Sequence, residues 1–412
     1  MTEKSSKPQI RFAGFNDTWE QRKFDEVFDC TIPNNTLSRA ELNYENGSVK
    51  NIHYGDILIR YGSIIDVQND EIPFATGKSI DDFKGALLQD GDIVIADTAE
   101  DETTGKACEI GNSQGVNVVS GLHTMVCRPR NKMASGYLGY YLNSDAYHHQ
   151  FLPLMQGIKV LSLSKTNVQK TTVCYPKREY EQQLIADYFR NLDNLITLHQ
   201  HKYDKLINVK KSMLEKMFPK NGSNVPEIRF KGFTKDWEQR KVSDMFRVTR
   251  GYVLAATLTE EVQTNEMPYP VYSSQTKDNG LLGYYKDFLY EDAITWTTDG
   301  ANAGTVNYRA GKFYCTNVCG VLLSNEVKAS KMIAEALNNV AKSYVSYVGN
   351  PKLMNNVVAD IEIMIPVSPL EQEKISNLFA VLDNLITLHQ CELEKLQNIK
   401  KACLEKMFVC VK

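Results

Sequence analysis

The sequence predicts an α+β protein in which two mixed α/β domains are separated by two long antiparallel coiled-coil helices, with a pseudo-two-fold internal repeat. Three observations lead to this prediction. The chain has 412 residues, which is too long for one ordinary hydrophobic core. One sequence block opens each half of the chain and another closes it. The closing block carries apolar residues at helical spacing along its whole length.

The opening block is the first part of the repeat. PQIRFAGFNDTWEQRKFDEVF (Pro8–Phe28) returns as PEIRFKGFTKDWEQRKVSDMF (Pro226–Phe246). The segments that follow it, 29–180 and 247–370, diverge strongly. The chain is therefore expected to be two units built on one frame, with different inserts.

The closing block is the second part of the repeat. Glu181–Phe218 returns as Glu371–Phe408, and both copies contain the identical nonapeptide LDNLITLHQ. Pro219 ends the first helix, and the following Asn-Gly-Ser is typical of a linker. The expected order is a first domain at 1–180, a spacer helix at 181–218, a linker at 219–225, a second domain at 226–370 and a second spacer helix at 371–412.

The start of each closing helix can also be read from the sequence. Ser368 and Glu371 form a capping box around Pro369, which suits the first helical position. Arg178 stands at the serine position of the first copy, so the first helix lacks this cap.

The apolar stripe on each closing helix predicts a seam with another helix. The obvious partner is the other copy, because two nearly identical stripes suit a self-complementary contact. The alternative is that each helix packs only on its own domain. If the helices cross antiparallel at their centres, the two seam histidines should lie close together. The seam residues are Leu192, Leu195, His199, Leu206, Leu382, Leu385, His389 and Leu396.

The inserts are expected to contain β-strands with short helices. Residues 51–63 and 87–111 have strand-like apolar runs bounded by Gly and Asp, and residues 288–323 have the same rhythm. DIVIADT (Asp92–Thr98) matches DAITWTT (Asp292–Thr298), and a loop that ends in glycine follows both. The inserts are therefore expected to share one fold and to differ in their loops.

Composition excludes some classes of protein. The chain is 42% hydrophobic and 24% charged, as in globular proteins. Its net charge of −3 means that any phosphate-binding surface must be local. No apolar run is long enough to cross a membrane, and MTEKSSKPQIRF lacks the apolar core of a signal peptide. Nine scattered cysteines without an export signal indicate reduced thiols, so we expect a cytoplasmic protein.

No catalytic, metal or cofactor site is predicted. ATGKS (Ala75–Ser79) lacks the first glycine of a phosphate-binding loop, and DGANAG (Asp299–Gly304) lacks the spacing of a dinucleotide motif. Cys315 and Cys319 have no further zinc ligands at a matching spacing. The acidic residues 97–102 are expected to form a solvated loop.

Several loops carry side chains that suit base edges and phosphates, although polar loops are common in any protein. Asn and Gln can pair with adenine, while Lys and Arg can hold guanine or phosphate. The candidate DNA contacts are Lys159, Ser162, Ser164, Lys165, Asn167, Ser273, Ser274, Gln275, Lys277, Asn279, Lys352 and Asn355.

The doubled frame resembles the specificity subunit of Type I restriction-modification systems. The strongest resemblance lies in CYPKREYEQQLIADYFRNLDNLITLHQ (Cys174–Gln200) and IPVSPLEQEKISNLFAVLDNLITLHQ (Ile365–Gln390). It implies that the inserts are target-recognition domains, each reading one half of a bipartite asymmetric site in double-stranded DNA. It implies that the helices set the gap between the halves.

The same resemblance implies the partners of this chain. Two copies of a methylation subunit would dock on the helices and carry the S-adenosylmethionine chemistry. Restriction subunits would carry the ATP-driven translocase and the nuclease, so this chain would have no catalysis and no cofactor of its own. The acidic loop at 97–102 should then point away from DNA or accept a hydrogen bond from a cytosine amino group.

Two other functions remain open from the residues alone. A helical scaffold could bind proteins through its inserts, and its binding would lack the steep salt dependence of phosphate contacts. A self-contained nuclease or methyltransferase is disfavoured by the absent cofactor motifs.

Overall fold

The protein divides into two compact units, each built from both ends of the repeat. The computed structural model describes residues 7–220, 222–275 and 277–410, with the side chains of Lys277 and Asp278 outside this description. Unit 1 comprises 1–199 and 392–412, and unit 2 comprises 200–391. The division cuts each long helix near its middle, whereas the sequence led us to treat the helices as separate segments.

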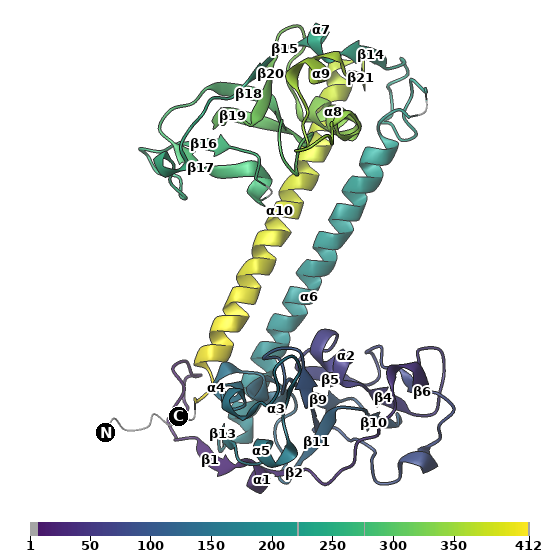
Figure 1. The fold of residues 1–412 in the computed structure, drawn as a ribbon, viewed down its shortest axis with the longest axis vertical. Helices are drawn as coiled ribbons and strands as arrows, with labels where there is room; N and C mark the ends of the chain where they lie inside the picture. Colours follow the sequence, from purple (N-terminus) through teal and green to yellow (C-terminus); the bar gives the residue numbers. More distant parts are fainter. Residues whose placement is uncertain (1–6, 221, 276, 411–412) are drawn as a thin grey trace. The chain divides into compact units, whose positions relative to one another are not determined.

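The closing blocks form two helices of 38 residues each, α6 (Glu179–Lys216) and α10 (Pro369–Lys406) (Figure 1). The predicted helices are therefore confirmed. α10 starts at the proline, as the sequence predicts. α6 starts at the equivalent place without a serine, and its Glu181 N–H reaches the Arg178 carbonyl oxygen at 3.0 Å.

The insert of unit 1 folds into short strands and helices. In chain order its elements are β1 (Glu20–Lys23), α1 (Phe24–Val27), β2 (Phe28–Asp29), η1 (Arg39–Glu41), β3 (Leu42–Asn43), β4 (Lys50–Ile52), α2 (Tyr54–Ile59), β5 (Ile64–Asp66), β6 (Phe74–Ala75), η2 (Ile80–Phe83), β7 (Ile93–Ala96), β8 (Thr98–Ala99), β9 (Ala107–Gly111), β10 (Val118–Ser120), β11 (Thr124–Pro129), α3 (Tyr137–Leu142), α4 (Asp145–His148), η3 (Leu152–Leu154), β12 (Leu161–Ser162), α5 (Lys165–Val168) and β13 (Thr172–Tyr175).

A five-stranded sheet in the order β2-β11-β7-β9-β5 forms the centre of unit 1. A four-stranded sheet in the order β10-β4-β6-β3 and the pairs β1-β13 and β12-β8 complete it. Part of the predicted strand run at 51–63 is wrong, because residues 54–59 form α2. His53 caps this helix, since its Nδ1 accepts the Gly55 N–H at 3.2 Å.

The insert of unit 2 is built on longer strands. In chain order its elements are β14 (Glu238–Lys241), α7 (Val242–Met245), β15 (Phe246–Arg250), η4 (Ala256–Leu258), β16 (Tyr269–Tyr272), η5 (Lys277–Gly280), β17 (Leu281–Tyr285), β18 (Tyr290–Thr297), β19 (Val306–Cys315), β20 (Cys319–Ser324), α8 (Lys331–Ala341), η6 (Lys342–Tyr344), α9 (Asn355–Asp360) and β21 (Glu362–Ile365).

A six-stranded sheet in the order β15-β20-β18-β19-β16-β17 forms the centre of unit 2. The predicted match between DIVIADT and DAITWTT is confirmed, because β7 and β18 are both interior strands of their sheets. The loop after each strand closes in the same way. The Gly105 N–H donates to the Ala96 carbonyl at 2.8 Å, and the Gly304 N–H donates to the Thr297 carbonyl at 2.9 Å.

The opening block ties each insert to its long helix. Its identical EQRK segments form β1 and β14, which pair with β13 and β21 just before α6 and α10. In unit 1, Arg11 donates two hydrogen bonds to the Glu181 carboxylate, at 2.7 and 2.9 Å. In unit 2, Arg229 donates the equivalent pair to Glu371 at 2.6 and 2.8 Å. The carboxylate predicted to complete the α10 capping box is thus held by an arginine.

The opening block also holds the end of the other long helix. The Ile10 N–H donates to the carbonyl of Lys406, the last residue of α10, at 2.9 Å. The Ile228 N–H donates to the carbonyl of Lys216, the last residue of α6, at the same distance. Each block therefore contacts the start of one helix and the end of the other within its own unit.

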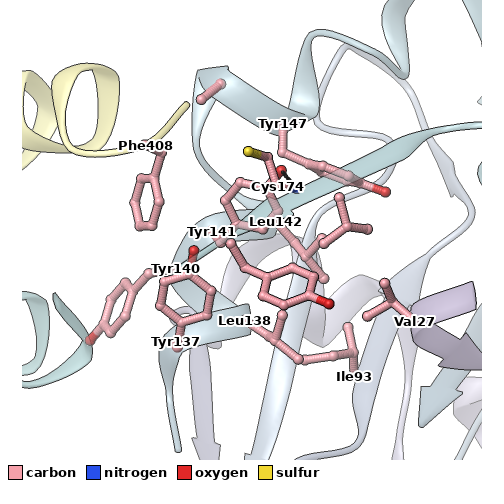
Figure 2. Packing of buried hydrophobic residues seen from close by; sticks show 14 of the residues in the cluster. Val27, Ile93, Tyr137, Leu138, Tyr140, Tyr141, Leu142, Tyr147, Cys174 and Phe408 are labelled. Atoms are coloured by element: carbon pink, nitrogen blue, oxygen red, sulfur yellow. Dashed lines mark hydrogen bonds between the residues drawn. The ribbon is translucent and has the colours of Figure 1, made fainter. Parts of the chain in front are cut away.

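The closing phenylalanine of each repeat completes the core of a unit. In unit 1, Phe408 stacks on Phe189 of α6, with ring centroids 5.7 Å apart, and lies 5.5 Å from Tyr141. Figure 2 shows it beside the tyrosines of α3. In unit 2, Phe218 packs against Phe379 of α10 at 5.9 Å.

Within each unit, α6 and α10 pack against each other in antiparallel directions. In unit 1, Tyr188 of α6 meets Cys403, and Asp193 meets Lys400, so the residue numbers rise on α6 and fall on α10. In unit 2 the same order appears, because Lys210 meets Asp383 and Phe218 meets Phe379 further along. The alternative in which each helix packs only on its own domain is therefore wrong.

The LDNLITLHQ repeat supplies an aspartate that pairs with a lysine on the other helix. Lys400 lies 2.5 Å from Asp193 in unit 1, and Lys210 lies 2.7 Å from Asp383 in unit 2. Tyr140 also donates to Asp193 at 2.8 Å. The repeat thus keeps the residues that join the two helices.

Four of the predicted seam residues contribute to the cores. Leu192 and Leu382 are buried, and Leu206 and Leu396 pack against the cores from positions that are partly buried. These four expectations agree with the burial in each unit.

The other predicted seam positions fit less closely. Leu195 and Leu385 lie at the edge of the stripe, 43% and 38% exposed. The neighbouring Ile196 and Ile386 are less exposed, because their position on the helical turn is closer to the partner helix. His199 and His389 are half-buried, next to the boundary between the units, and their proximity stays a prediction.

A buried carboxylate in unit 1 makes stability depend on pH. Glu109 of β9 accepts the N–H groups of Gly136 and Gly139 at 2.5 and 3.0 Å. Burial raises the pKa of its carboxyl from 4.5 to about 7. The folded protein therefore holds a proton that the unfolded chain has released, and stability falls as pH rises through this window.

We expect the contribution of Glu109 to lower the free energy of unfolding by about 2 kcal/mol between about pH 5 and pH 7. Glu109→Gln should remove this part of the pH dependence, because an amide does not titrate. Urea unfolding of both proteins at the two pH values measures the difference. The same pH slope in both proteins would contradict the prediction.

Candidate nucleic-acid interface

Three loops of unit 2 meet beside the end of β18. They are 273–280 after β16, 298–304 after β18, and 347–351 before α9. Asn302 donates through Nδ2 to the Ser274 carbonyl at 3.0 Å. The Gly300 N–H donates to the Pro351 carbonyl at 3.0 Å. The loop after β18 thus joins the other two: the first carries five of the predicted DNA contacts of unit 2, and Lys352 and Asn355 follow the third.

A buried arginine lies under the loop at 273–280. Arg309 of β19 is 8% exposed, and its guanidinium lies 3.7 Å from the ring centroid of Tyr272. It donates to Thr295 Oγ1 at 3.1 Å and to the Asn279 carbonyl at 2.6 Å. No carboxylate with a described side chain pairs with it, and burial lowers the pKa of its guanidinium. Its role within the unit is to connect the loop to the sheet.

Four predicted contacts of unit 2 use their side chains within the unit, and Ser274 and Asn279 are bound there through their backbone carbonyls. Lys277 cannot be assessed, because its side chain lies outside the described part. The contacts are Ser273 Oγ with Thr316 Oγ1 at 3.0 Å, the Ser274 carbonyl with Asn302, Gln275 Nε2 with the Leu281 carbonyl, the Asn279 carbonyl with Arg309, Lys352 Nζ with Asp299 at 3.7 Å, and Asn355 Nδ2 with the Thr249 carbonyl at 3.4 Å.

Unit 1 places a hairpin beside the acidic loop. Ser162 of β12 pairs with Thr98 of β8, and Thr104 Oγ1 donates to the Leu161 carbonyl at 3.5 Å. Glu100 and Glu102 are exposed in the same loop. The β8-β12 pair therefore holds the acidic loop beside the hairpin that carries predicted DNA contacts, and the expectation that this loop points away from DNA or accepts from a cytosine amino group stays a prediction.

Among the predicted contacts of unit 1, Lys159 is exposed, and it alone makes no hydrogen bond or ion pair with the described residues. The other four stabilise the local structure. Ser162 Oγ donates to the Gln156 carbonyl at 3.3 Å, Ser164 Oγ accepts the Asn167 N–H at 3.2 Å, Lys165 Nζ donates to the Cys30 carbonyl, and Asn167 Nδ2 donates to the Leu154 carbonyl at 3.2 Å.

Sequence reasoning missed a cationic cluster around Tyr44 in unit 1. The guanidiniums of Arg39 and Arg60 lie 5.6 and 5.2 Å from its ring centroid, and both donate to its hydroxyl. The buried Asp56 holds Arg39 through two hydrogen bonds, at 2.6 and 2.9 Å. Arg39, Tyr44 and Arg60 lie in η1, after β3 and after α2 and follow no motif, so only the fold gathers both arginines around the tyrosine.

The described residues offer no group of three or more His, Cys, Asp or Glu side chains that could hold a metal ion. Cys315 and Cys319 are buried, and burial raises the pKa of both thiols. In the same part of the chain, no helix combines the length and the apolar character needed to cross a lipid bilayer.

Comparison with known proteins assigns the family. The model of the Type I restriction modification DNA specificity domain matches residues 16–208 and 234–398. The chain belongs to this family. Specificity subunits provide DNA target recognition within a restriction-modification complex and are not catalytic themselves.

Individual relatives agree with this assignment. The specificity subunit of the Type I restriction enzyme MpnII from Mycoplasma pneumoniae is 34% identical over 168 residues. That match covers 40% of this chain and 46% of the relative, which is less than half of the relative's length. The crystal structure of the S subunit of a Type I restriction-modification system from M. genitalium shares the fold, with a TM-score of 0.64 at 15% identity. It covers 98% of this specificity subunit and 100% of the other chain.

Proposed function

We propose that unit 1 and unit 2 each read one half of a bipartite, asymmetric sequence in double-stranded DNA. The observation that carries this proposal is the repetition of the frame around different loops. The Arg11–Glu181 and Arg229–Glu371 pairs occupy equivalent positions, while the loops beside β7 and β18 differ in sequence. A pseudo-two-fold protein matches the local two-fold symmetry of the DNA backbone, and different loops make the recognised sequence asymmetric.

In this proposal the long helices set the spacing of the half-sites and bind the partner subunits. α6 and α10 set the unread gap between the half-sites, and two copies of a methylation subunit dock on their repeated surfaces. Restriction subunits join the full complex, and S-adenosylmethionine and ATP belong to those partners. The complex acts on chromosomal and invading DNA, so the chain works in the cytoplasm.

Salt dependence tests DNA binding against the scaffold alternative. The chain is purified with its methylation subunit, and its affinity for duplexes that carry the methylated sequence is measured at rising salt. Contacts with several phosphates make the logarithm of the affinity fall linearly with the logarithm of the salt concentration, by about 0.9 per phosphate. An affinity that depends on neither the salt concentration nor the DNA sequence would favour a scaffold whose inserts bind proteins.

Arg309 should act as a positioning residue for unit 2. We expect Arg309→Ala to weaken recognition of one half-site by about tenfold, because Asn279 and Tyr272 lose the group that holds them. Arg309→Lys should recover part of this loss, since it keeps the charge without the planar fork.

Methylation rates on sites with single base changes measure the Arg309 effect. Only bases of one half-site should be affected, which a general loss of stability would not produce. Equal weakening at both half-sites would contradict the positioning role.

A further inference from the structure

Each unit carries a hairpin tip at the same place in the repeat. Tip 1 is residues 157–161, and reciprocal backbone hydrogen bonds of 3.0 and 2.8 Å between Gln156 and Ser162 close it. Tip 2 is residues 347–351, closed by equivalent bonds of 2.8 and 2.9 Å between Ser346 and Lys352. The two tips are therefore equivalent hairpins of the same length.

The base of each tip is anchored in its unit. The buried Leu163 donates its N–H to the Asp97 carbonyl at 2.8 Å, and the buried Leu353 donates to the Thr298 carbonyl at 2.8 Å. These acceptors begin the loops that follow β7 and β18. Each tip is thus fixed next to the loops of the candidate interface.

The tips present apolar side chains to solvent. Ile158 is 99% exposed and Val348 is 93% exposed, more than any other large hydrophobic side chain in the described residues. Val160 and Tyr347 beside them are 51% and 70% exposed. A single exposed apolar residue is ordinary, but two anchored tips at equivalent places indicate a common use.

The sequences of the tips distinguish between two possible partners. Two identical methylation subunits would meet equivalent surfaces, and such surfaces would be expected to repeat in sequence as the frame does. The tips read GIKVL and YVGNP, with no identical residue at any equivalent position. Duplex DNA has a backbone with local two-fold symmetry and a base sequence without it. Two tips at equivalent positions with different residues are therefore suited to contact DNA.

We propose that the apolar side chains of tip 1 and tip 2 contact bases of the half-site read by their own unit. The proposal rests on the proposed function, in which each unit reads one half-site. Apolar side chains recognise the thymine methyl group in the major groove. Glu100 and Glu102 beside tip 1 would repel phosphates, so its contact is with base edges and not with the backbone.

The test replaces one tip residue at a time in the complex of the full chain with its methylation subunit. Ile158→Ser and Val348→Ser should each lower methylation of the native site by about tenfold, because serine removes the apolar contact with the base. Each variant should relax the base preference in one half-site only. Ile59→Ser and Val262→Ser are controls matched in exposure, since these residues are 83% and 71% exposed and belong to neither tip, and neither should change methylation.

A graft provides a gain-of-function test. Replacing Ile158–Val160 by the Val-Gly-Asn of tip 2 keeps the hairpin length, the anchors and Gly157, whose φ of +128° and close approach to the Val160 carbonyl leave no room for a side chain. We expect the variant to assemble normally and to change the base preference of the half-site read by unit 1 without altering the other half-site.

The outcomes separate this proposal from the proposed function. If the native complex methylates a bipartite site and the tip variants keep its rate and base preference, the tips do not contact bases and the proposed function stands. If the tip variants lose the methylation subunit on purification, the tips bind protein and the proposal is overturned. If the native complex methylates no bipartite site, the proposed function itself fails.

Discussion

Arg229→Ala is expected to lower the free energy of unfolding of unit 2 by about 3–5 kcal/mol. Glu371 is 0% exposed and accepts both of its ion-pair hydrogen bonds from this arginine. Removing the guanidinium leaves a buried carboxylate without its counter-charge. Urea unfolding, followed by circular dichroism and by tryptophan fluorescence, measures the loss.

Arg11→Ala is the matched variant in unit 1, and it should cost about 1–2 kcal/mol less than Arg229→Ala. The reason is one hydrogen bond that only unit 1 has. Trp19 Nε1 donates to Glu181 at 3.3 Å, whereas the buried Trp237 Nε1 has no hydrogen-bond partner among the described residues. The double variant Arg229→Met with Glu371→Leu should recover most of the loss, because no charge stays buried. Equal losses for the two single alanine variants would contradict this explanation.

Phe408→Ala should destabilise unit 1 by about 3–5 kcal/mol, the usual cost of a large cavity in a core. Phe408 is 3% exposed and contacts the rings of Phe189 and Tyr141 (Figure 2). Because it follows the end of α10, its loss should also loosen the contact between α10 and α6 in unit 1. The midpoint of urea unfolding measures this effect.

Leu388→Ala is the control for Phe408→Ala. Leu388 lies in α10, the helix that Phe408 follows, but it is 54% exposed, so its replacement should change stability by less than about 0.5 kcal/mol. Comparable losses in the two variants would mean that the closing phenylalanine is not a core residue.

The repeated frame of the protein could be predicted because its opening and closing blocks each occur twice in the sequence. Both copies of the closing block carry the same apolar spacing, and Pro369 marks a helix start directly. The match of DIVIADT with DAITWTT identified equivalent interior strands. These features depend on local periodicity and on repetition, which one sequence contains in full.

The positions of the recognition loops could be predicted from the sequence, but which of their side chains are free to contact DNA could not. Lys165 and Asn355 have the residue types of DNA contacts, yet both donate to backbone carbonyls within their own units. The sequence did not indicate a role for Arg309, because its contacts with Tyr272 and Asn279 form only when distant segments come together in the fold. Whether a polar side chain is free depends on its tertiary neighbours, and spacing alone does not encode them.

The stretch at 54–59 shows the limit of apolar runs as evidence. Its apolar run after Gly and Asp is typical of a strand, but the His53 cap and the pairing of Asp56 with Arg39 hold it as a helix. A run this short is compatible with either structure, and the cap decides between them.

The central proposal is that the two units of this chain read two different half-sites at a fixed distance. The direct measurement is to express the chain with its methylation subunit in a host without other methylation and to sequence the methylated positions across the genome. We predict one asymmetric motif in two parts, separated by a gap of constant length and unrestricted sequence. A single uninterrupted motif, or a gap of variable length, would contradict two readers joined by α6 and α10.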